Sequence, residues 1–200
     1  MNRREAIQRT AMMLGYAISA PAVMGVLNGC KATPELAFKP VFFNEDQARS
    51  IEILSEIIIP KTKTPGAKDV GVPGFIDQML KEVYSKESQD DFLKGLHEFD
   101  EDAKHTYGNN FITCDATEQI DLFKKHHNTA FDKPLQSATL GWWNPRPGGG
   151  KPFILQVKEL VILGFFTSEV GASRALQYNE VPGPYKGCVP LKEVGKTWAT

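Results

Sequence analysis

Residues 44–60 read NEDQARSIEILSEIIIP, and this stretch decides the fold class of the 200-residue chain. Asn44 can cap a helix whose first turn is acidic, and apolar residues then recur at helical spacing until Pro60 ends the pattern. The predicted inward residues are Ala48, Ile51, Leu54, Ile57 and Ile58. One face of this helix is therefore suited to burial against other helices.

Four further segments show helical spacing of apolar residues. The second helix is expected to begin with Pro73 in its first turn, and the third to run from Ser88 to Gly108. Asp115 and Glu118 have the spacing of a capping box and open the fourth helix, and residues 152–165 form the fifth. The predicted inward residues are Ile76, Met79, Leu80 and Val83, then Phe92, Leu96, Phe99 and Ala103, then Ile120, Phe123, His127 and Ala130, and last Val157, Leu160, Val161 and Phe165.

Long loops separate these helices. Proline and glycine punctuate residues 60–74 and 141–150, and the tail over residues 181–200 is expected to be irregular. The sequence shows no alternating strand pattern, no internal repeat and no coiled coil. It therefore predicts an all-α fold, an irregular helical bundle of about five helices with long Pro/Gly-rich loops.

The first thirty residues have the features of an export signal. Arg3 and Arg4 precede a modest apolar run, residues 11–27, which is the pattern of a twin-arginine signal. A transmembrane anchor is the alternative, but the run is shorter than about twenty apolar residues and is interrupted by glycine, serine and proline. It ends at Leu27-Asn28-Gly29-Cys30, which resembles a lipobox apart from Asn28, so lipidation is expected at Cys30. We expect a signal peptide over residues 1–29, a tether over residues 30–43 and a single helical domain over residues 44–200.

The composition is that of an ordinary soluble domain. Residues 1–29 hold three arginines and one glutamate, so the formal net charge of −1 for the whole chain becomes −3 after their removal. A mature chain of about 170 residues is long enough for one domain with a hydrophobic core. Because there is no excess of basic residues, no nucleic-acid partner is expected.

Two cysteines remain after Cys30 is assigned to the lipid. In an oxidising periplasm, Cys114 and Cys188 are candidates for a disulfide, which would stabilise the fold by roughly 4 kcal/mol in the chain-entropy model. The alternative is two separate buried thiols. In either case two cysteines are too few for the usual zinc or iron–sulfur ligand set.

The sequence lacks the familiar cofactor motifs. Its one glycine run, residues 148–150, follows prolines rather than a strand, and no Cys-x-x-Cys-His motif offers covalent haem attachment. Ser168 and Glu169 follow an apolar helix without a nucleophile-elbow pattern, so a capping or packing role is expected for Ser168. The histidines show no chelating pattern, and no metal site is predicted; they are His97, His105, His126 and His127.

Two adjacent tryptophans, Trp142 and Trp143, lie in the loop between the fourth and fifth predicted helices. Large aromatic side chains are costly to leave in water. They are therefore expected either to fold back on the core of the domain or to contact a partner, and the sequence leaves both open.

Four segments carry a resemblance to a known family. Residues 57–67 (IIIPKTKTPGA) and 71–77 (GVPGFID) resemble the small subunit of membrane-bound gluconate 2-dehydrogenase, also called its third or gamma subunit. Residues 164–171 (GFFTSEVG) and 178–188 (YNEVPGPYKGC) are similar to the same family. Together with the leader, the resemblance spans nearly the whole chain.

The resemblance implies a non-catalytic subunit. In such complexes a large flavoprotein subunit uses FAD to oxidise a sugar or sugar acid, and a cytochrome c subunit with haem c commonly carries the electrons onward. The small subunit accompanies the flavoprotein through export and maturation. No catalytic, cofactor-binding or metal residue is therefore expected on this chain. Its lipobox departs from the simplest family picture, and the lipid would anchor the complex to a membrane on the periplasmic side. The block from Pro60 to Asp77 is expected to be a rigid loop and helix start that either shapes the bundle or touches the large subunit. The candidate partner contacts are Pro60, Thr64, Pro65, Gly66, Pro73, Phe75, Trp142 and Trp143.

Two other functions remain open from the sequence. An independent exported enzyme could build an active site without a known motif, using His97, His105, Ser168 or Glu169. A stand-alone envelope lipoprotein could share only its ancestry with the family. Turnover or a cofactor spectrum from the chain alone would favour the enzyme, and co-expression with a flavoprotein gene would count against the lipoprotein.

Overall fold

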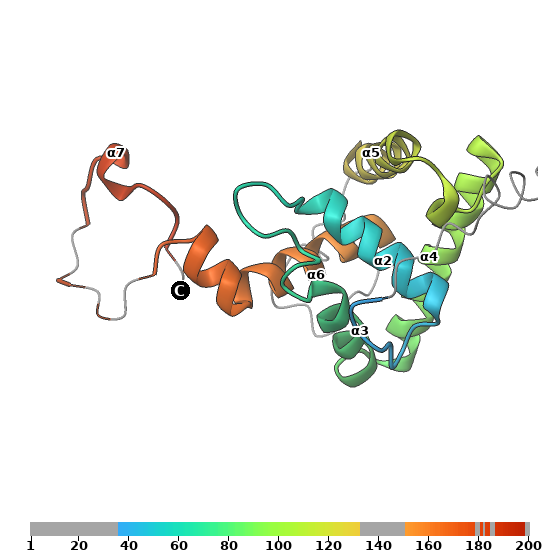
Figure 1. Ribbon diagram of the computed structural model, residues 1–200, viewed down its shortest axis with the longest axis horizontal. Coiled ribbons are helices and arrows are strands. Elements are labelled where there is room, and N and C mark those ends of the chain that lie inside the picture. Colours follow the sequence, from blue (N-terminus) through green and yellow to red (C-terminus); the bar gives the residue numbers. More distant parts are fainter. Residues whose placement is uncertain (1–35, 133–150, 179–180, 182, 185–186, 199–200) are drawn as a thin grey trace, which may run out of the picture. The chain divides into compact units, whose positions relative to one another are not determined.

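The chain folds into a helical unit that begins at Leu36. The computed structural model describes residues 36–132, 151–178, 181, 183–184 and 187–198. Its main helices are α2 (Glu45–Ile58), α3 (Val72–Glu82), α4 (Lys86–Tyr107), α5 (Ala116–Asp132) and α6 (Phe153–Thr167), and the short ones are the 3-10 helix η1 (Phe111–Thr113), the π-helix η3 (Gly171–Ala175) and α7 (Leu191–Val194) (Figure 1). Within these described ranges there is no strand, only an isolated bridge between Gln177 and Trp198. The predicted all-α class with five principal helices is confirmed.

Helix α6 is the centre of the bundle. It packs against α2, α3, α4 and α5, and in Figure 1 it passes behind α2 and above α3. Its buried apolar residues are Ile154, Val157, Leu160, Val161 and Phe165, which includes all four predicted inward residues. The sequence of α6 is apolar around most of the helix, as expected for a helix that has neighbours on several sides.

Local signals explain where the helices begin. The Asn44 side chain accepts from the Gln47 backbone N–H at 2.8 Å, and the Gln47 side chain accepts from the Asn44 N–H at 3.0 Å. Asp115 and Glu118 form the predicted capping box in the same reciprocal way. These caps satisfy backbone donors that have no partner within the first turn of a helix.

The prediction that the third helix starts at Ser88 is wrong. Helix α4 begins at Lys86, and Ser85 is the N-cap, whose Oγ accepts from the Ser88 N–H at 3.3 Å. Ser88 is instead buried in the first turn. Ser85 and Ser88 are three residues apart, so the sequence alone allows either one to be the N-cap. Ser88 is buried within the helix, and Ser85 is the N-cap. The predicted end at Gly108 is confirmed.

Two residues predicted to point inward are exposed. Val83 is the C-cap of α3 and is 53% exposed, because the helix ends there. Ile120 is 39% exposed and lines an open groove. Among the described side chains of α5, the buried ones are Leu122 and Ala130, which are spaced by multiples of four residues and so share one face. The prediction for Ala130 is therefore confirmed, whereas Leu122 was not predicted. The face of α5 that meets the bundle is therefore rotated from the predicted one.

Residues 36–43, which the sequence assigned to the tether, pack against the helical core. Phe43 is buried, and Leu36, Phe38 and Phe42 are partly buried against the same cluster. The ring of Phe43 also lies 6.0 Å from the ring of Phe92 on α4. This segment is therefore part of the helical unit.

Several sequence predictions fall outside the described residues. They concern Arg3, Arg4, Cys30, Trp142 and Trp143, and they stay predictions. Among the residues that the structure does describe, no helix is both long enough and apolar enough to cross a membrane.

Candidate interaction surfaces

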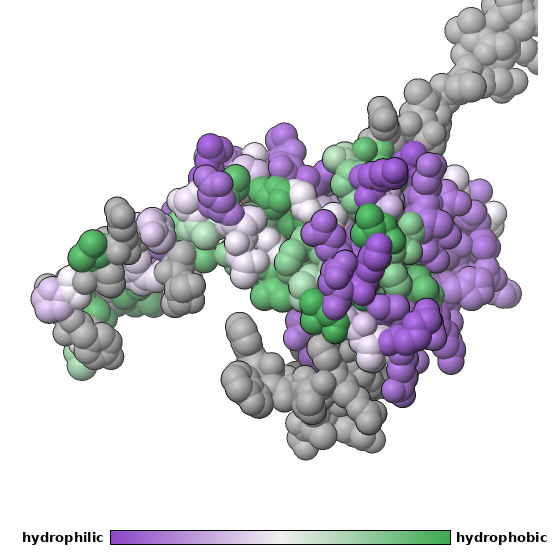
Figure 2. Space-filling model, turned by 90° about the horizontal axis from the view of Figure 1, so that it is seen from below, coloured by the Kyte–Doolittle hydropathy of each residue, from purple (hydrophilic) through white to green (hydrophobic). Residues whose placement is uncertain are grey.

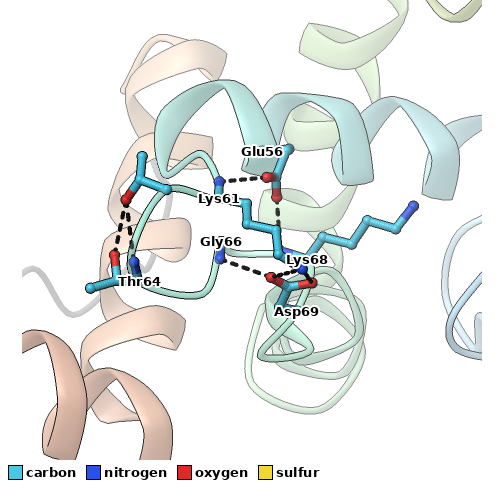
Figure 3. A network of polar contacts seen from close by, with 7 residues as sticks. Glu56, Lys61, Thr64, Gly66, Lys68 and Asp69 are labelled. Carbon is cyan, nitrogen blue, oxygen red and sulfur yellow. Dashed lines mark hydrogen bonds and ion pairs between the residues drawn. The ribbon is translucent and has the colours of Figure 1, made fainter.

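The loop that follows α2 is held by a network of polar contacts (Figure 3). The Glu56 carboxylate at the end of α2 accepts from the Lys61 N–H at 2.7 Å and from the Lys68 N–H at 3.3 Å. Asp69 accepts from the Gly66 N–H at 3.2 Å, and its carboxylate forms an ion pair with Lys61 Nζ at 3.0 Å. Hydrogen bonds from Lys61 and from the Gly66 amide lower the pKa of Asp69. The loop is therefore ordered by its own residues, without needing a partner.

Gly66 is required by the close approach of these groups. A Cβ atom at this position would lie 2.5 Å from Glu56 Oε1 and 2.7 Å from the Lys61 backbone nitrogen. Gly66 is buried inside the loop, so it is not accessible for the predicted contact with a partner. Glycine is retained here because a side chain would break the network that fixes the loop.

The second half of the block, residues 71–77, attaches α3 to the rest of the bundle. The Asp77 side chain is 1% exposed, and its carboxylate accepts three backbone hydrogen bonds, from Val41 (2.7 Å), Phe42 (3.0 Å) and Phe43 (2.8 Å). Three backbone N–H groups therefore have an acceptor inside the fold. Asp77 thereby joins the segment before α2 to α3, a structural role that the sequence analysis did not assign.

Phe75 also has an internal contact. A Cβ atom on Gly164 of α6 would lie 2.6 Å from the Phe75 ring, so the missing side chain lets α3 and α6 approach closely. Of the predicted partner contacts in the described chain, Gly66 and Pro73 are buried, Thr64, Pro65 and Phe75 are half-buried, and Pro60 is exposed. The block from Pro60 to Asp77 therefore mainly shapes the bundle and leaves its first residues at the surface.

An open groove of about 540 Å³ lies between α2, the loop after it and α5. Its apolar lining comes from Ile53, Ile57, Pro60, Ile120 and Phe123. Helix α5 packs mainly on α6, so its contact with α2 is incomplete and leaves these side chains partly in water. The exposure of Ile120, which the sequence predicted to be inward, is explained by this groove.

Exposed apolar residues are concentrated in the C-terminal segment, residues 162–198. Eleven large hydrophobic residues are exposed in the described chain, and eight of them lie here: Ile162, Leu163, Phe166, Tyr178, Val181, Val189, Leu191 and Trp198. None of the described residues after Gly171 is buried. Figure 2 shows hydrophobic patches over this segment at the left of the view, and further hydrophobic patches between polar side chains on the rest of that face. Such surface is typical of a site that a partner covers.

A polar cluster joins α4 to α5 beside a hollow of about 700 Å³. Asp102 Oδ2 lies 2.7 Å from Lys125 Nζ and 2.9 Å from His126 Nε2. The hydrogen bond from Lys125, followed by that from His126, lowers the pKa of the Asp102 carboxyl group. The His126 ring also packs edge-on against Phe99, with ring centroids 4.8 Å apart. This cluster fixes the position of α5 on α4.

The residues of the alternative enzyme do not come together in one site. His97 and His105 are exposed and two turns apart on α4. Ser168 Oγ donates to the Phe165 carbonyl at 2.6 Å and accepts from the Gly171 N–H at 3.0 Å, so the predicted capping role is confirmed. Glu169 is exposed. Among the described residues, no group of three or more His, Cys, Asp or Glu residues could hold a metal ion.

The two candidate disulfide cysteines are free in the structure. Cys114 is 8% exposed, and burial raises the pKa of its thiol. Cys188 is exposed, which also differs from the alternative of two buried thiols. A buried, protonated thiol is a poor nucleophile for thiol–disulfide exchange. The disulfide is thus not shown, and Cys114 belongs to the core.

The fold and these surfaces define a small all-α domain with an ordered loop block, an apolar groove and an exposed apolar C-terminal segment. A family model described as gluconate 2-dehydrogenase subunit 3 matches residues 45–183. The chain belongs to this family, as its sequence motifs indicated. By its name, the family is one subunit of a multi-subunit dehydrogenase. No curated protein and no solved structure matches the chain.

Proposed function

We propose that this chain is a non-catalytic small subunit of a periplasmic, flavin-dependent dehydrogenase that oxidises a sugar or a sugar acid of the gluconate type. It docks on the flavoprotein subunit and serves in the export, maturation and membrane anchoring of that subunit. FAD, and haem c where a cytochrome c subunit is present, belong to the partner subunits. The chain itself contributes binding surface and binds no cofactor.

The observation that carries this proposal is the apolar C-terminal segment. Eight of the eleven exposed large hydrophobic residues lie within residues 162–198, although the same domain buries its other large apolar residues efficiently. Burying apolar surface is worth roughly 25 cal/mol per Å², so a partner that covers these side chains would bind through them. Membership in a family of dehydrogenase subunits supports another dehydrogenase subunit as this partner.

The leader supports the route and the location. The twin-arginine pathway carries folded proteins, so Arg3 and Arg4 could direct both this chain and a bound flavoprotein across the inner membrane. Lipid on Cys30 would then hold the complex at a periplasmic membrane surface. Replacing both arginines by lysine (Arg3→Lys with Arg4→Lys) should leave the two proteins in the cytoplasm. Normal export of the flavoprotein would contradict the escort role.

The main experiment is purification of the tagged chain from its native membranes in a mild detergent, followed by flavin absorbance and stoichiometry. We expect one flavoprotein per chain, with sugar or sugar-acid dehydrogenase activity. A variant with Val189→Ser and Leu191→Ser should lose most of the flavin, while its melting temperature stays unchanged.

The matched control replaces two exposed valines outside the C-terminal segment. Val41→Ser and Val83→Ser remove apolar side chains that are 50% and 53% exposed, compared with 44% for Val189. This control should retain the flavoprotein. A wild-type chain that emerges alone and colourless would overturn the proposed function.

A further inference from the structure

We propose that the part of the C-terminal segment after Gly171, here called the basic arm (residues 172–198), docks on a face of the flavoprotein subunit that combines apolar side chains with carboxylates. This inference rests on the proposed function for the identity of the partner. It adds the chemistry of the docking face and assigns a role to three basic residues, Arg174, Lys192 and Lys196, here called the basic cluster.

Charge is divided unevenly along the chain. Residues 36–171 contain 15 basic and 20 acidic residues, which gives a formal net charge of −5. Residues 172–200 contain four basic and two acidic residues, which gives +2. The three most exposed large hydrophobic residues of the described chain, Tyr178, Val181 and Leu191, lie in this positive part. The apolar arm is therefore basic although the mature chain as a whole is acidic.

Hydrogen bonds within the arm bring its two ends together. The Gln177 backbone N–H donates to the Thr197 carbonyl at 2.8 Å, and the Gln177 side-chain amide donates to two further carbonyls within residues 194–196. Lys196 Nζ lies 3.5 Å from the Arg174 carbonyl oxygen. Basic residues from two separate stretches of chain therefore share one small region.

The basic cluster is not neutralised within the described chain. Its three members are exposed, and none of the ion pairs between described residues involves them. The one acidic residue described in the arm is Glu193, which is also exposed. Several lysines of the helical body, in contrast, lie within 3.0 Å of a carboxylate oxygen: Lys61, Lys68, Lys104, Lys125 and Lys151. Carboxylates on the partner would complement the excess positive charge of the arm.

Exposed apolar side chains lie next to the basic cluster. Leu191 is 86% exposed and precedes Lys192, and Trp198 is 47% exposed and forms a backbone bridge with Gln177. Tyr178 follows Gln177 and is 65% exposed. Trp, Tyr and Arg are the residues most enriched among those that dominate binding at protein interfaces. The complementary face is therefore apolar with carboxylates at its margin.

A second copy of this chain is a poorer occupant. The described part of its helical body exposes only three large hydrophobic residues, Val41, Val83 and Ile120, which lie on three different segments. That is too little apolar surface to cover the arm. Contact between two arms would instead place one basic cluster against another, which is unfavourable.

A membrane surface is also a poorer occupant. Segments that lie in a membrane interface are typically amphipathic helices with an extended apolar face. The helices described after Val170 are η3, with five residues, and α7, with four. Neither is long enough to form such a face, so a polypeptide fits the arm better.

The test measures the dissociation constant of the full mature chain for its flavoprotein in a neutral detergent, at low and at high salt. Lys192→Glu with Lys196→Glu should weaken binding about tenfold at low salt, because it turns attraction into repulsion, and the loss should shrink at high salt. Glu193→Lys should strengthen binding about twofold at low salt, because it removes the one described carboxylate of the arm. A merely structural role of these side chains would not produce tighter binding.

The matched control is Lys86→Glu with Lys94→Glu on α4. It changes the net charge by the same amount, at lysines whose side chains are 77% and 75% exposed. This control should bind as the wild type does, which separates the charge of the arm from the overall charge of the chain. All variants should keep the wild-type melting temperature within a few degrees, because the positions are at the surface.

The outcomes separate this inference from the proposed function. If the wild type binds the flavoprotein but the charge variants of the arm bind equally well at low salt, the acidic docking face is overturned and the proposed function stands. If the charge substitutions weaken binding only when phosphatidylglycerol is added to the detergent, the arm binds a membrane and the inference is overturned. It is likewise overturned if they abolish a dimer of this chain and leave flavoprotein binding unchanged. If no flavoprotein accompanies the wild type, both proposals are overturned.

Discussion

The helical body, residues 36–161, and the C-terminal segment, residues 162–198, differ in how they use apolar residues. Of the 21 buried hydrophobic residues in the described chain, which form the core, 20 lie in the body, and only three large hydrophobic residues of its described part are exposed. Among the described residues of the C-terminal segment, Phe165 is the one large hydrophobic residue of the core, and eight large hydrophobic residues are exposed. The apolar residues of the body therefore stabilise the monomer, whereas those of the segment are available for association.

The two regions also differ in their polar contacts. In the body, buried or ordered carboxylates connect distant parts of the chain, as Asp77 does with residues 41–43 and Asp102 does with α5. In the C-terminal segment, the hydrogen bonds of Gln177 go to residues 194–197 of the same segment. The comparison teaches that the body, together with Gly164 and Phe165 of α6, carries the stability of the fold. The part of the segment after Gly171, where no described residue is buried, can change without unfolding it.

The largest expected effect is on the core. Phe92 is fully buried and packs edge-on against Phe153, with centroids 5.1 Å apart. Phe92→Ala should lower the free energy of unfolding by about 3 to 5 kcal/mol, because it removes this packing and leaves a cavity. Leu191→Ala, at a position 86% exposed in the C-terminal segment, should change it by less than about 0.5 kcal/mol. Denaturant unfolding of both variants tests this difference between the body and the segment. A large loss of unfolding free energy in Leu191→Ala would show that the segment also stabilises the fold.

The next effect concerns the buried carboxylate of the body. Asp77→Ala should cost about 3 kcal/mol, because three backbone donors lose a charged acceptor and two of them belong to Phe42 and Phe43, which pack on the core. Asp77→Asn should cost about half as much, since its one oxygen can still accept from Phe42 and Phe43. Chemical denaturation would measure both values. Equal stability of all three proteins would show that residues 36–43 are not held through Asp77.

A smaller effect is expected from adding a single methyl group to the loop block. Gly66→Ala should cost about 1 to 3 kcal/mol, because the new Cβ would collide with the Glu56 carboxylate and the Lys61 nitrogen. Gly183→Ala is the matched control in the C-terminal segment, where a Cβ has nothing within 4 Å. Thermal unfolding of both variants gives the comparison. If Gly66→Ala melts with the wild type, the loop is more adaptable than its contacts indicate.

The sequence could predict the features that depend on neighbours along the chain. Helix periodicity, the cap at Asn44, the capping box of Asp115 and Glu118, and the end of α4 at Gly108 are set within a few residues, and each was found. The reciprocal bond from Gln47 to Asn44 was not predicted. The family was identified from motifs for the same reason, since its Pro/Gly-rich block is continuous in sequence. Val83 was mispredicted because α3 ends there, and Ile120 was mispredicted because α2 does not cover that part of α5. Apolar periodicity alone encodes neither feature.

The features that join distant residues could not be predicted. The bonds from Asp77 to residues 41–43 and the fit of Phe75 onto Gly164 depend on how helices are placed. One signal was present for Asp77: it lies beside Ile76 on a short helix whose other residues are mostly apolar, where an acid needs donors. The groove was also invisible in the sequence, because it results from incomplete contact between α2 and α5.

The smallest expected effect is the pH dependence of the α4–α5 contact. Lys125 and His126 lower the pKa of Asp102 below its ordinary value of 3.8 in the folded state. At a pH above the pKa of Asp102 in the unfolded chain, the carboxylate therefore stabilises the fold. This contribution disappears as the pH falls through the lower pKa of Asp102 in the folded state. Unfolding measured from about pH 4 to about pH 2 should show a steeper loss of stability for the wild type than for Asp102→Asn.

Glu193→Gln, on α7, is the control for removing a carboxylate from an exposed position in the C-terminal segment. The comparison with Asp102→Asn is informative because the Asp102 contact joins two helices of the body, and its loss should loosen α5 first. Helix α5 also forms one wall of the groove. Acid should therefore increase amide hydrogen exchange in α5 before it unfolds the body, and Asp102→Asn should show the increase already at neutral pH. Unchanged exchange in Asp102→Asn would show that α5 keeps its place without this contact.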